Sequence, residues 1–259
     1  MRFKDQVVII TGATGGLGSD AARGFAREGA RLLLVDRDDG AALAAELGAR
    51  FHRADVTGDA DVAGYVQAAL DAFGRIDVFF NNAGIEGRVA PITELTEADF
   101  DAVMGVNVKG VFLGLRHVLP VMLRQRSGAI VNTGSTASHV GSPGLGPYVA
   151  SKHAVLGLTR VAAVEAARMG VRVNAVCPGP TETRMIRSLE EQAAARGMND
   201  ARERYMAGIP LGRYCTPAEV TAAVMFLCSA EASGITGTHL LVDGGRNGAP
   251  SSSAIRNPT

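Results

Sequence analysis

The stretch that most constrains the fold is a glycine-rich turn between a short apolar segment and a helical segment. Val7–Thr11 is apolar and β-branched, the sequence TGATGGLG overlaps its end, and an alanine-rich helical pattern runs from about Leu17 to Glu28. A strand, a glycine turn and a helix in this order form a phosphate-binding unit of an α/β fold. In such a unit Gly12 permits a tight turn, Gly16 lets backbone approach a diphosphate, and Gly18 lets helix and strand pack closely.

The same alternation of strand and helix continues along the chain. The predicted strands are Val7–Thr11, Arg31–Val35, Arg50–Ala54, Val78–Phe80, Ala129–Thr133, Arg172–Cys177 and His239–Val242. The predicted helices are 17–28, 39–47, 59–73, 96–123 with breaks, 148–169 and 217–229. This order favours right-handed crossovers and a parallel sheet covered by helices on both faces. The sequence therefore predicts an α/β fold, a single-domain Rossmann fold with a doubly wound sheet of about seven strands.

We expect that domain to span residues 1–245. Within it, the charged helical stretch at about 182–210 has a poor core pattern and is interpreted as a flap over a site. Residues 246–259 are rich in Ser, Pro and Asn, which predicts a C-terminal tail that is mobile or serves as an oligomer arm.

Composition and charge exclude several classes of protein. With 47% hydrophobic and 20% charged residues, the chain has the composition of a folded globular domain. Its 26 basic and 26 acidic residues balance, so no net charge attracts it to nucleic acid or to an anionic membrane. The three cysteines have no metal-ligand spacing, and no signal-type apolar run precedes the first strand. We therefore expect a cytoplasmic protein without a metal, a nucleic-acid partner or a membrane segment.

The end of the second strand bears on the choice of cofactor. Asp36 lies where an acidic residue accepts hydrogen bonds from the ribose hydroxyls of a dinucleotide, and its charge would repel a 2′-phosphate. NAD is therefore favoured over NADP. The neighbouring Arg37 keeps NADP open, because an arginine at this place can pair with a 2′-phosphate.

A tyrosine and a lysine four residues apart offer acid–base chemistry. On a helix, Tyr148 and Lys152 would lie on one face about one turn apart. An ammonium group near a phenol favours the phenolate, so Lys152 is expected to lower the pKa of Tyr148 from about 10. Ser135 supplies a neutral hydroxyl that could hold a substrate oxygen. By itself the Tyr-x-x-x-Lys pair is weak evidence, because such pairs also occur on surface helices.

The motifs taken together resemble the short-chain dehydrogenase/reductase family over essentially residues 4–245. The resemblance rests on a series of motifs in order: Thr11-Gly12-x-x-x-Gly16-x-Gly18, Asp36, Asp55-Val56, Asn81-Asn82-Ala83-Gly84, Asn107, Ser135, Tyr148-x-x-x-Lys152 and Pro178-Gly179. Within this family the chain looks most similar to members of the NAD-preferring type. These are above all cyclohexanol dehydrogenases and the reductases of cyclic ketones such as levodione.

The resemblance assigns roles to four catalytic residues. Tyr148 would exchange a proton with the substrate oxygen, which Ser135 holds, and Lys152 would lower the pKa of Tyr148 and bind the nicotinamide ribose. Asn107 would anchor a water that links Lys152 to solvent. The residues that the resemblance places at the cofactor are Gly12, Gly16, Leu17, Gly18, Asp36, Asp55, Val56, Asn82, Ala83, Gly84, Tyr148, Lys152, Pro178, Gly179, Thr181 and Thr183.

The family resemblance leaves three activities to be weighed. The leading one is an NAD(H)-dependent alcohol dehydrogenase or ketone reductase that acts on a small or cyclic secondary alcohol or ketone. The second is an NADPH-dependent 3-oxoacyl-carrier-protein reductase, for which Arg126 fits one carrier-docking position but Met169 does not fit the other. The third is a catalytically silent, cofactor-sensing regulator.

Further expectations concern the substrate and the assembly. His139, Tyr205 and Met206 are candidates for contact with the substrate, against the simpler interpretation of solvated or packed side chains. Gly134 stands where many relatives carry a first serine before the catalytic one, which predicts a roomier pocket wall. The helix 148–169 is apolar or small around much of its circumference, so a second face is expected to pack on another subunit, in a homotetramer.

Overall fold

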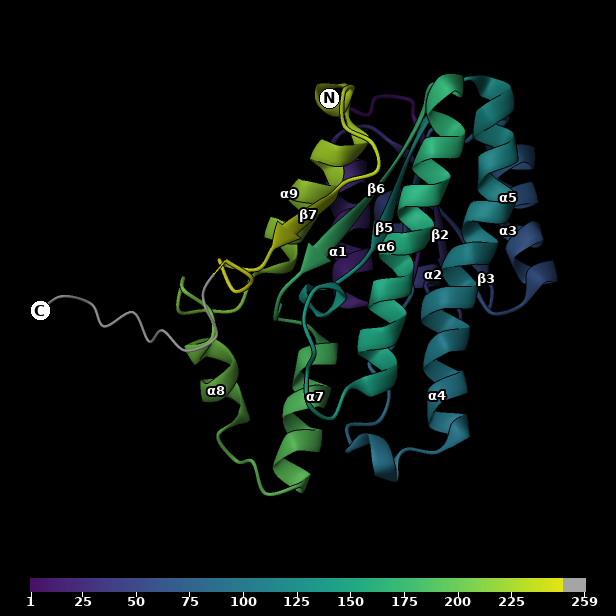
Figure 1. Cartoon of the computed structure of the whole chain (residues 1–259). Coiled ribbons are helices and arrows are strands. Elements are labelled where there is room, and N and C mark those ends of the chain that lie inside the picture. Colours follow the sequence, from purple (N-terminus) through teal and green to yellow (C-terminus); the bar gives the residue numbers. More distant parts are fainter. Residues whose placement is uncertain (249–259) are drawn as a thin grey trace, which may run out of the picture.

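The computed structural model describes residues 1–248, and they form one sheet with helices on both faces (Figure 1). Seven parallel strands pair in the order β3–β2–β1–β4–β5–β6–β7. The strands are β1 (Val7–Thr11), β2 (Arg31–Asp36), β3 (Arg50–Arg53), β4 (Val78–Asn81), β5 (Gly128–Thr133), β6 (Val171–Pro178) and β7 (His239–Val242). This confirms the predicted doubly wound Rossmann architecture.

Nine α-helices within residues 1–248 connect and cover these strands. They are α1 (Gly16–Arg27), α2 (Ala41–Leu47), α3 (Asp59–Phe73), α4 (Glu97–Met104), α5 (Gly110–Gln125), α6 (Gly146–Ala166), α7 (Arg184–Ala195), α8 (Ala201–Ala207) and α9 (Pro217–Cys228). The predicted boundaries are confirmed to within a few residues, and those of α3 and β7 agree with the structure at both ends.

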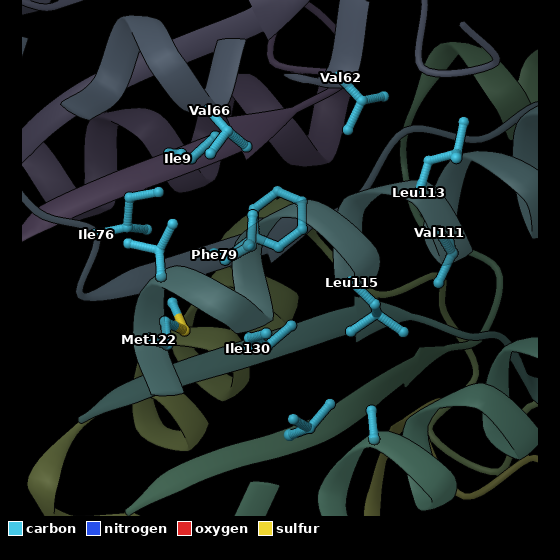
Figure 2. Packing of buried hydrophobic residues seen from close by; sticks show 14 of the residues in the cluster. Ile9, Val62, Val66, Ile76, Phe79, Val111, Leu113, Leu115, Met122 and Ile130 are labelled. Atoms are coloured by element: carbon cyan, nitrogen blue, oxygen red, sulfur yellow. The ribbon is translucent and has the colours of Figure 1, made fainter. Parts of the chain in front are cut away.

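Helices cover both faces of the sheet, and successive residues of each strand point to opposite faces, so every strand residue can be buried. In β1, Ile9 faces a core cluster shared with α3, α5 and α6, whereas Val8 and Ile10 face a second cluster shared with α1, α2 and α9. Phe79 of β4 lies among the side chains of the first cluster, as Figure 2 shows. This double burial explains the nearly continuous apolar runs that made the strands visible in the sequence.

The long helical segment before β5 is broken, as predicted. The run Glu97–Gln125 consists of α4, a π-helical turn at Gly105–Lys109 and α5. By length and composition this run is apolar enough to cross a membrane, but half of its most apolar window is buried inside the domain. It supplies Val118 and Met122, both at 0% exposure, to the first core cluster, which is the behaviour of a core helix.

The predicted flap is helical and consists of α7 and α8, which project below the sheet in Figure 1. A small apolar cluster of its own, built on Ile186, Ile209 and Tyr214, holds these helices together. Residues 246–248 of the predicted tail are tied to the end of β7, since the carboxylate of Asp243 accepts hydrogen bonds from the Gly245 and Asn247 amides. The remaining tail, residues 249–259, lies outside the described residues.

Candidate active site

The main cleft lies at the carboxyl ends of β1 and β4, where the winding of the sheet changes direction. Open α/β sheets bind ligands at this switch point. The cleft has a volume of about 420 Å³. The predicted cofactor residues that line it are Gly12, Gly16, Leu17, Asp36, Asp55, Val56, Asn82, Ala83, Gly84, Tyr148, Lys152, Pro178, Gly179, Thr181 and Thr183. Of the predicted catalytic and cofactor residues, Gly18 and Asn107 are the two that do not belong to this lining.

The glycine turn after β1 is formed as the sequence predicted. Gly12 has a φ of +64°, a left-handed conformation that side chains disfavour. A Cβ at Gly18 would lie 2.1 Å from the Gly12 carbonyl oxygen, so Gly18 permits the close packing of α1 on the turn. Gly18 therefore allows the glycine turn to form but does not itself line the cleft.

Asp36 at the end of β2 organises this turn. One of its carboxylate oxygens accepts hydrogen bonds from the Thr14 amide at 2.8 Å and from the Thr14 hydroxyl at 2.7 Å. The other oxygen accepts from the Asp38 amide at 3.1 Å. The carboxylate thus holds the glycine turn while its side chain faces the cleft. Thr14 gave no signal in the sequence beyond its place in the turn.

Asp55 occupies the adjacent wall. One oxygen of its carboxylate accepts hydrogen bonds from the amide and the hydroxyl of Thr57, and the Thr57 amide is the main reason why the pKa of Asp55 is lowered. The other oxygen has no partner among residues 1–248 and remains an acceptor at the cleft. The charge of Arg37 acts on the same carboxylate and also lowers its pKa.

Asn82 serves mainly as a bridge between three strands. Its side-chain amide donates to the Thr11 and Gly12 carbonyls, and its oxygen accepts from the Thr133 hydroxyl at 3.1 Å. These bonds fix the segment after β4 to the glycine turn and to β5. Asn82 lines the cleft as predicted, with its side-chain groups already committed to protein partners.

Ser135 lies in the loop after β5, where a short helical turn at Thr136–Ser138 begins. Its hydroxyl accepts a hydrogen bond from the Ala137 amide at 3.1 Å, and its own amide donates to the Ser138 hydroxyl. Ser138 in turn donates to the Lys152 carbonyl at 2.8 Å, which joins this loop to α6. These contacts fix the position of the Ser135 hydroxyl in the cleft.

The expectation of a roomier wall at Gly134 is wrong. A Cβ at this position would lie 2.7 Å from the sulfur of Cys177, so this side chain of β6 fills the space. Burial raises the pKa of the Cys177 thiol to about 11, so Cys177 is a neutral packing group behind the Ser135 loop. The sequence shows the missing side chain at Gly134 but not its distant partner.

Tyr148 and Lys152 share one face of α6, as predicted. The helix begins at Gly146 with Pro147 in its first turn, a position where proline is favoured because its missing N–H would have no partner. The Lys152 amine is buried, donates to the Thr133 carbonyl at 2.8 Å, and lies 5.6 Å from the centroid of the Tyr148 ring. The structure therefore brings the phenol, the amine and the Ser135 hydroxyl into one cleft.

The prediction that the pKa of Tyr148 is lowered is wrong when only the protein's own groups act on the phenol. Burial raises the pKa of this phenol, and hydrogen bonding with Ser135 opposes the rise only in part. Burial also lowers the pKa of Lys152 to about 8. The sequence argument counted the attraction between the two groups and omitted the desolvation of both, which dominates in a buried site.

Asn107 is held in the π-helical turn between α4 and α5. Its oxygen accepts from the Ile85 amide at 2.8 Å, and its side-chain amide donates to the Ile85 carbonyl and to the Ser151 hydroxyl. Ser151 donates to the Tyr148 carbonyl at 2.7 Å, so Asn107 is linked to the backbone of the α6 turn that carries the phenol. A Cβ at Gly84 would lie 3.3 Å from the Asn107 oxygen and 3.5 Å from the Lys152 amine, which places both groups around Gly84.

Among the candidate substrate residues, only Tyr205 lines the cleft. His139 packs its ring against His239, with centroids 4.4 Å apart, and Met206 packs on the apolar cluster of the flap. Sequence reasoning missed several cleft residues, namely Thr14, Ala137, Val140, Leu145, Met185, Leu189 and Arg246. They lie on loops and on the flap, where no periodic pattern shows which side chain turns inward.

Comparison with known proteins places this site in a family. The family model described as enoyl-(acyl carrier protein) reductase matches residues 12–247. Levodione reductase of Leifsonia aquatica is 43% identical over 258 residues, which cover 96% of this chain and 96% of that protein. The chain belongs to the short-chain dehydrogenase/reductase family. This membership confirms the resemblance that the motifs indicated.

Solved structures of short-chain dehydrogenases/reductases agree with the fold. The crystal structure of levodione reductase superposes with a TM-score of 0.93 at 42% identity, covering 96% of this chain and 100% of that one. A 3-ketoacyl-(acyl-carrier-protein) reductase from Brucella melitensis, complexed with NADH, gives 0.87 at 35% identity, covering 94% and 98%. This short-chain dehydrogenase/reductase is therefore an oxidoreductase of the alcohol dehydrogenase and ketone reductase type, and its family uses nicotinamide cofactors.

Proposed function

We propose that the protein interconverts a small or cyclic secondary alcohol and its ketone with NAD(H). The observation that carries this proposal is the convergence of Ser135, Tyr148 and Lys152 in one cleft that Asp36 also lines. The likeness to levodione reductase supports a cyclic ketone. Apolar side chains in the cleft wall suit a carbon skeleton: Ala137, Val140, Leu145, Met185 and Leu189.

The residues of the cleft fit a dinucleotide. The glycine turn leaves backbone free at the start of α1, and the free oxygen of Asp55 can accept from an adenine amino group. Asp36 would accept from ribose hydroxyls and would repel a 2′-phosphate, which supports NAD over NADP. When bound, the nicotinamide supplies or accepts the hydride.

The protein's own side chains handle the oxygen and one proton. Ser135 donates a hydrogen bond to the carbonyl oxygen, and Tyr148 gives that oxygen its proton in reduction or removes the proton in oxidation. The amine of Lys152 binds ribose hydroxyls and supports negative charge on Tyr148. Asn107 holds the turn of α6 that carries Tyr148, and a water beside Asn107 would pass protons between Lys152 and solvent.

The proposal is tested by following absorbance of the reduced cofactor. Purified protein is supplied with NADH or NADPH and with cyclic ketones, linear ketones or a 3-oxoacyl thioester. We expect turnover of cyclic ketones, with NADH preferred because of Asp36. Faster turnover of the thioester with NADPH would favour a carrier-protein reductase and contradict the role given to Asp36. Cofactor binding without turnover of any substrate would favour a regulator.

We also propose that the protein is a homotetramer that acts in the cytoplasm. Three neighbouring helices expose large apolar side chains: Phe100 on α4, Phe112 on α5 and Val161 and Val164 on α6. Val164 is 79% exposed, and exposed apolar side chains on neighbouring helices favour contact with another copy. All three cysteines are free thiols, as expected in a reducing compartment. Light scattering that gave the mass of a single chain would contradict the tetramer.

A further inference from the structure

One wall of the cleft carries hydrogen-bond donors that are not among the catalytic residues. The flap and the segment after β7 contribute Tyr205 of α8, Arg246 and Arg184 to the lining. Arg184 is exposed, whereas Tyr205 and Arg246 are both partly buried. In Figure 1, α8 lies well apart from α6, the helix that carries Tyr148. These donors therefore face the cleft from a different wall than the proton donor.

The guanidinium of Arg246 has most of its capacity unused. One nitrogen donates to the Tyr205 carbonyl at 3.2 Å, which fixes the side chain against α8. Within residues 1–248 no carboxylate lies within 4 Å of it, whereas Arg202, the half-buried arginine of α8, is paired with Glu182 and Glu190. A guanidinium offers five N–H donors, so several remain for a ligand.

The hydroxyl of Tyr205 lies in the field of the same cation. Burial raises the pKa of Tyr205, and the charge of Arg246 acts in the opposite direction. The hydroxyl has no hydrogen-bond partner in the described part of the chain, so it too can serve a ligand. Neither group is among the fully buried polar atoms without a partner in residues 1–248, so both can exchange solvent for an oxygen acceptor of a ligand.

We propose that Arg246 and Tyr205 form a subsite for a second oxygen acceptor of the substrate, a carboxylate or a carbonyl away from the reacting carbon. The inference rests on the proposed function and narrows its substrate class to ketones and alcohols that carry such a group. A planar guanidinium can bind a carboxylate with two parallel hydrogen bonds and a carbonyl with one. The subsite would select these substrates over plain cyclic ketones and would fix their orientation.

The test compares three probes with NADH: cyclohexanone, cyclohexane-1,4-dione and 4-oxocyclohexanecarboxylate. We expect Arg246→Gln to lower kcat/KM for the carboxylate roughly 10- to 100-fold, mainly through KM, and for the dione by a smaller factor. Turnover of cyclohexanone should stay within about twofold, because it has no group for the subsite. Arg246→Lys should recover part of the loss with the carboxylate. Arg187→Gln, an exposed arginine of α7 outside the lining, is the matched control and should change nothing.

Three results would overturn the subsite. The first is an equal loss with all three ketones, which would mean that Arg246 acts only by holding α8. The second is an unchanged preference in Arg246→Gln. The third is a weaker binding of NADH itself in that variant, because the arginine would then contact the cofactor.

A binding measurement separates this inference from the proposed reaction. Calorimetric titration of the NADH-loaded protein with cyclohexanecarboxylate, which cannot react, should show binding that Arg246→Gln weakens about 10-fold or more. This result without turnover of any ketone would support the subsite and refute the proposed reaction. Turnover of ketones without this difference in binding would do the reverse.

Discussion

Replacing Tyr148 by Phe is expected to lower kcat for ketone reduction roughly 10²- to 10⁴-fold, the usual contribution of a general acid or base. The change removes only the hydroxyl, and the ring keeps its place in the first turns of α6. Hydride transfer to the carbonyl carbon would then leave an alkoxide without a proton donor. Because no segment at the cofactor residues of the cleft is held by a hydrogen bond from this hydroxyl, the affinity for NADH should stay nearly unchanged.

The matched control is Tyr65→Phe. Tyr65 is buried, at 1% exposure, and its side chain lies in the core cluster between α3 and the sheet and is absent from the cleft lining. This variant should keep the activity of the original protein. The measurement is steady-state turnover together with NADH binding by fluorescence. Tyr148→Phe with more than about a tenth of the original kcat would refute Tyr148 as the proton donor.

The fold was largely predictable because both faces of the sheet are covered. Strands such as Val7–Thr11 are buried on both sides and read as continuous apolar runs between turn residues. The start of α9, predicted at 217, is marked by a capping box in which Thr216 and Glu219 bond each other's backbone amides, a pattern that a sequence shows locally. Local signals of this kind need no knowledge of distant contacts.

The parts of the site that sequence reasoning missed depend on partners far along the chain. Cys177 fills the space beside Gly134 from another strand, and no local pattern connects the two. Arg246 was assigned to a tail because of the composition that follows it, but the Asp243 carboxylate holds the backbone of that turn near the cleft. The pKa of Tyr148 was misjudged because burial is a property of the whole fold.

The second large effect concerns Lys152, whose replacement by Met should lower kcat/KM by roughly two to three orders of magnitude. The methionine keeps the length of the apolar stem but removes the charge that supports Tyr148 and the donor for ribose hydroxyls. Unlike Tyr148→Phe, this variant should therefore also raise the KM for NADH. An unchanged KM for the cofactor would contradict the ribose contact proposed for Lys152.

The dependence on pH gives the sharper test of Lys152. Its pKa is lowered to about 8, so in the original protein the amine loses its charge as pH rises through that value. We expect kcat/KM for ketone reduction to be level below pH 8 and to fall above it, and Lys152→Met should lack this step. Tyr148 does not produce the step, because burial raises its pKa from 10.

The stability of the folded protein should respond to the same ionisation, but it should increase with pH where the activity falls. Between pH 8 and 10.5 the unfolded chain holds a proton on Lys152 that the folded chain has released. Lys152 therefore makes the free energy of unfolding increase as the pH rises through this range. Below pH 8 the folded protein bears the cost of a buried charge. Lys152→Met should remove that gain, which denaturant titrations at pH 7 and 9.5 would measure. An identical pH dependence in both proteins would show that the Lys152 amine titrates as it does in the unfolded chain, and the activity step near pH 8 would then need another group.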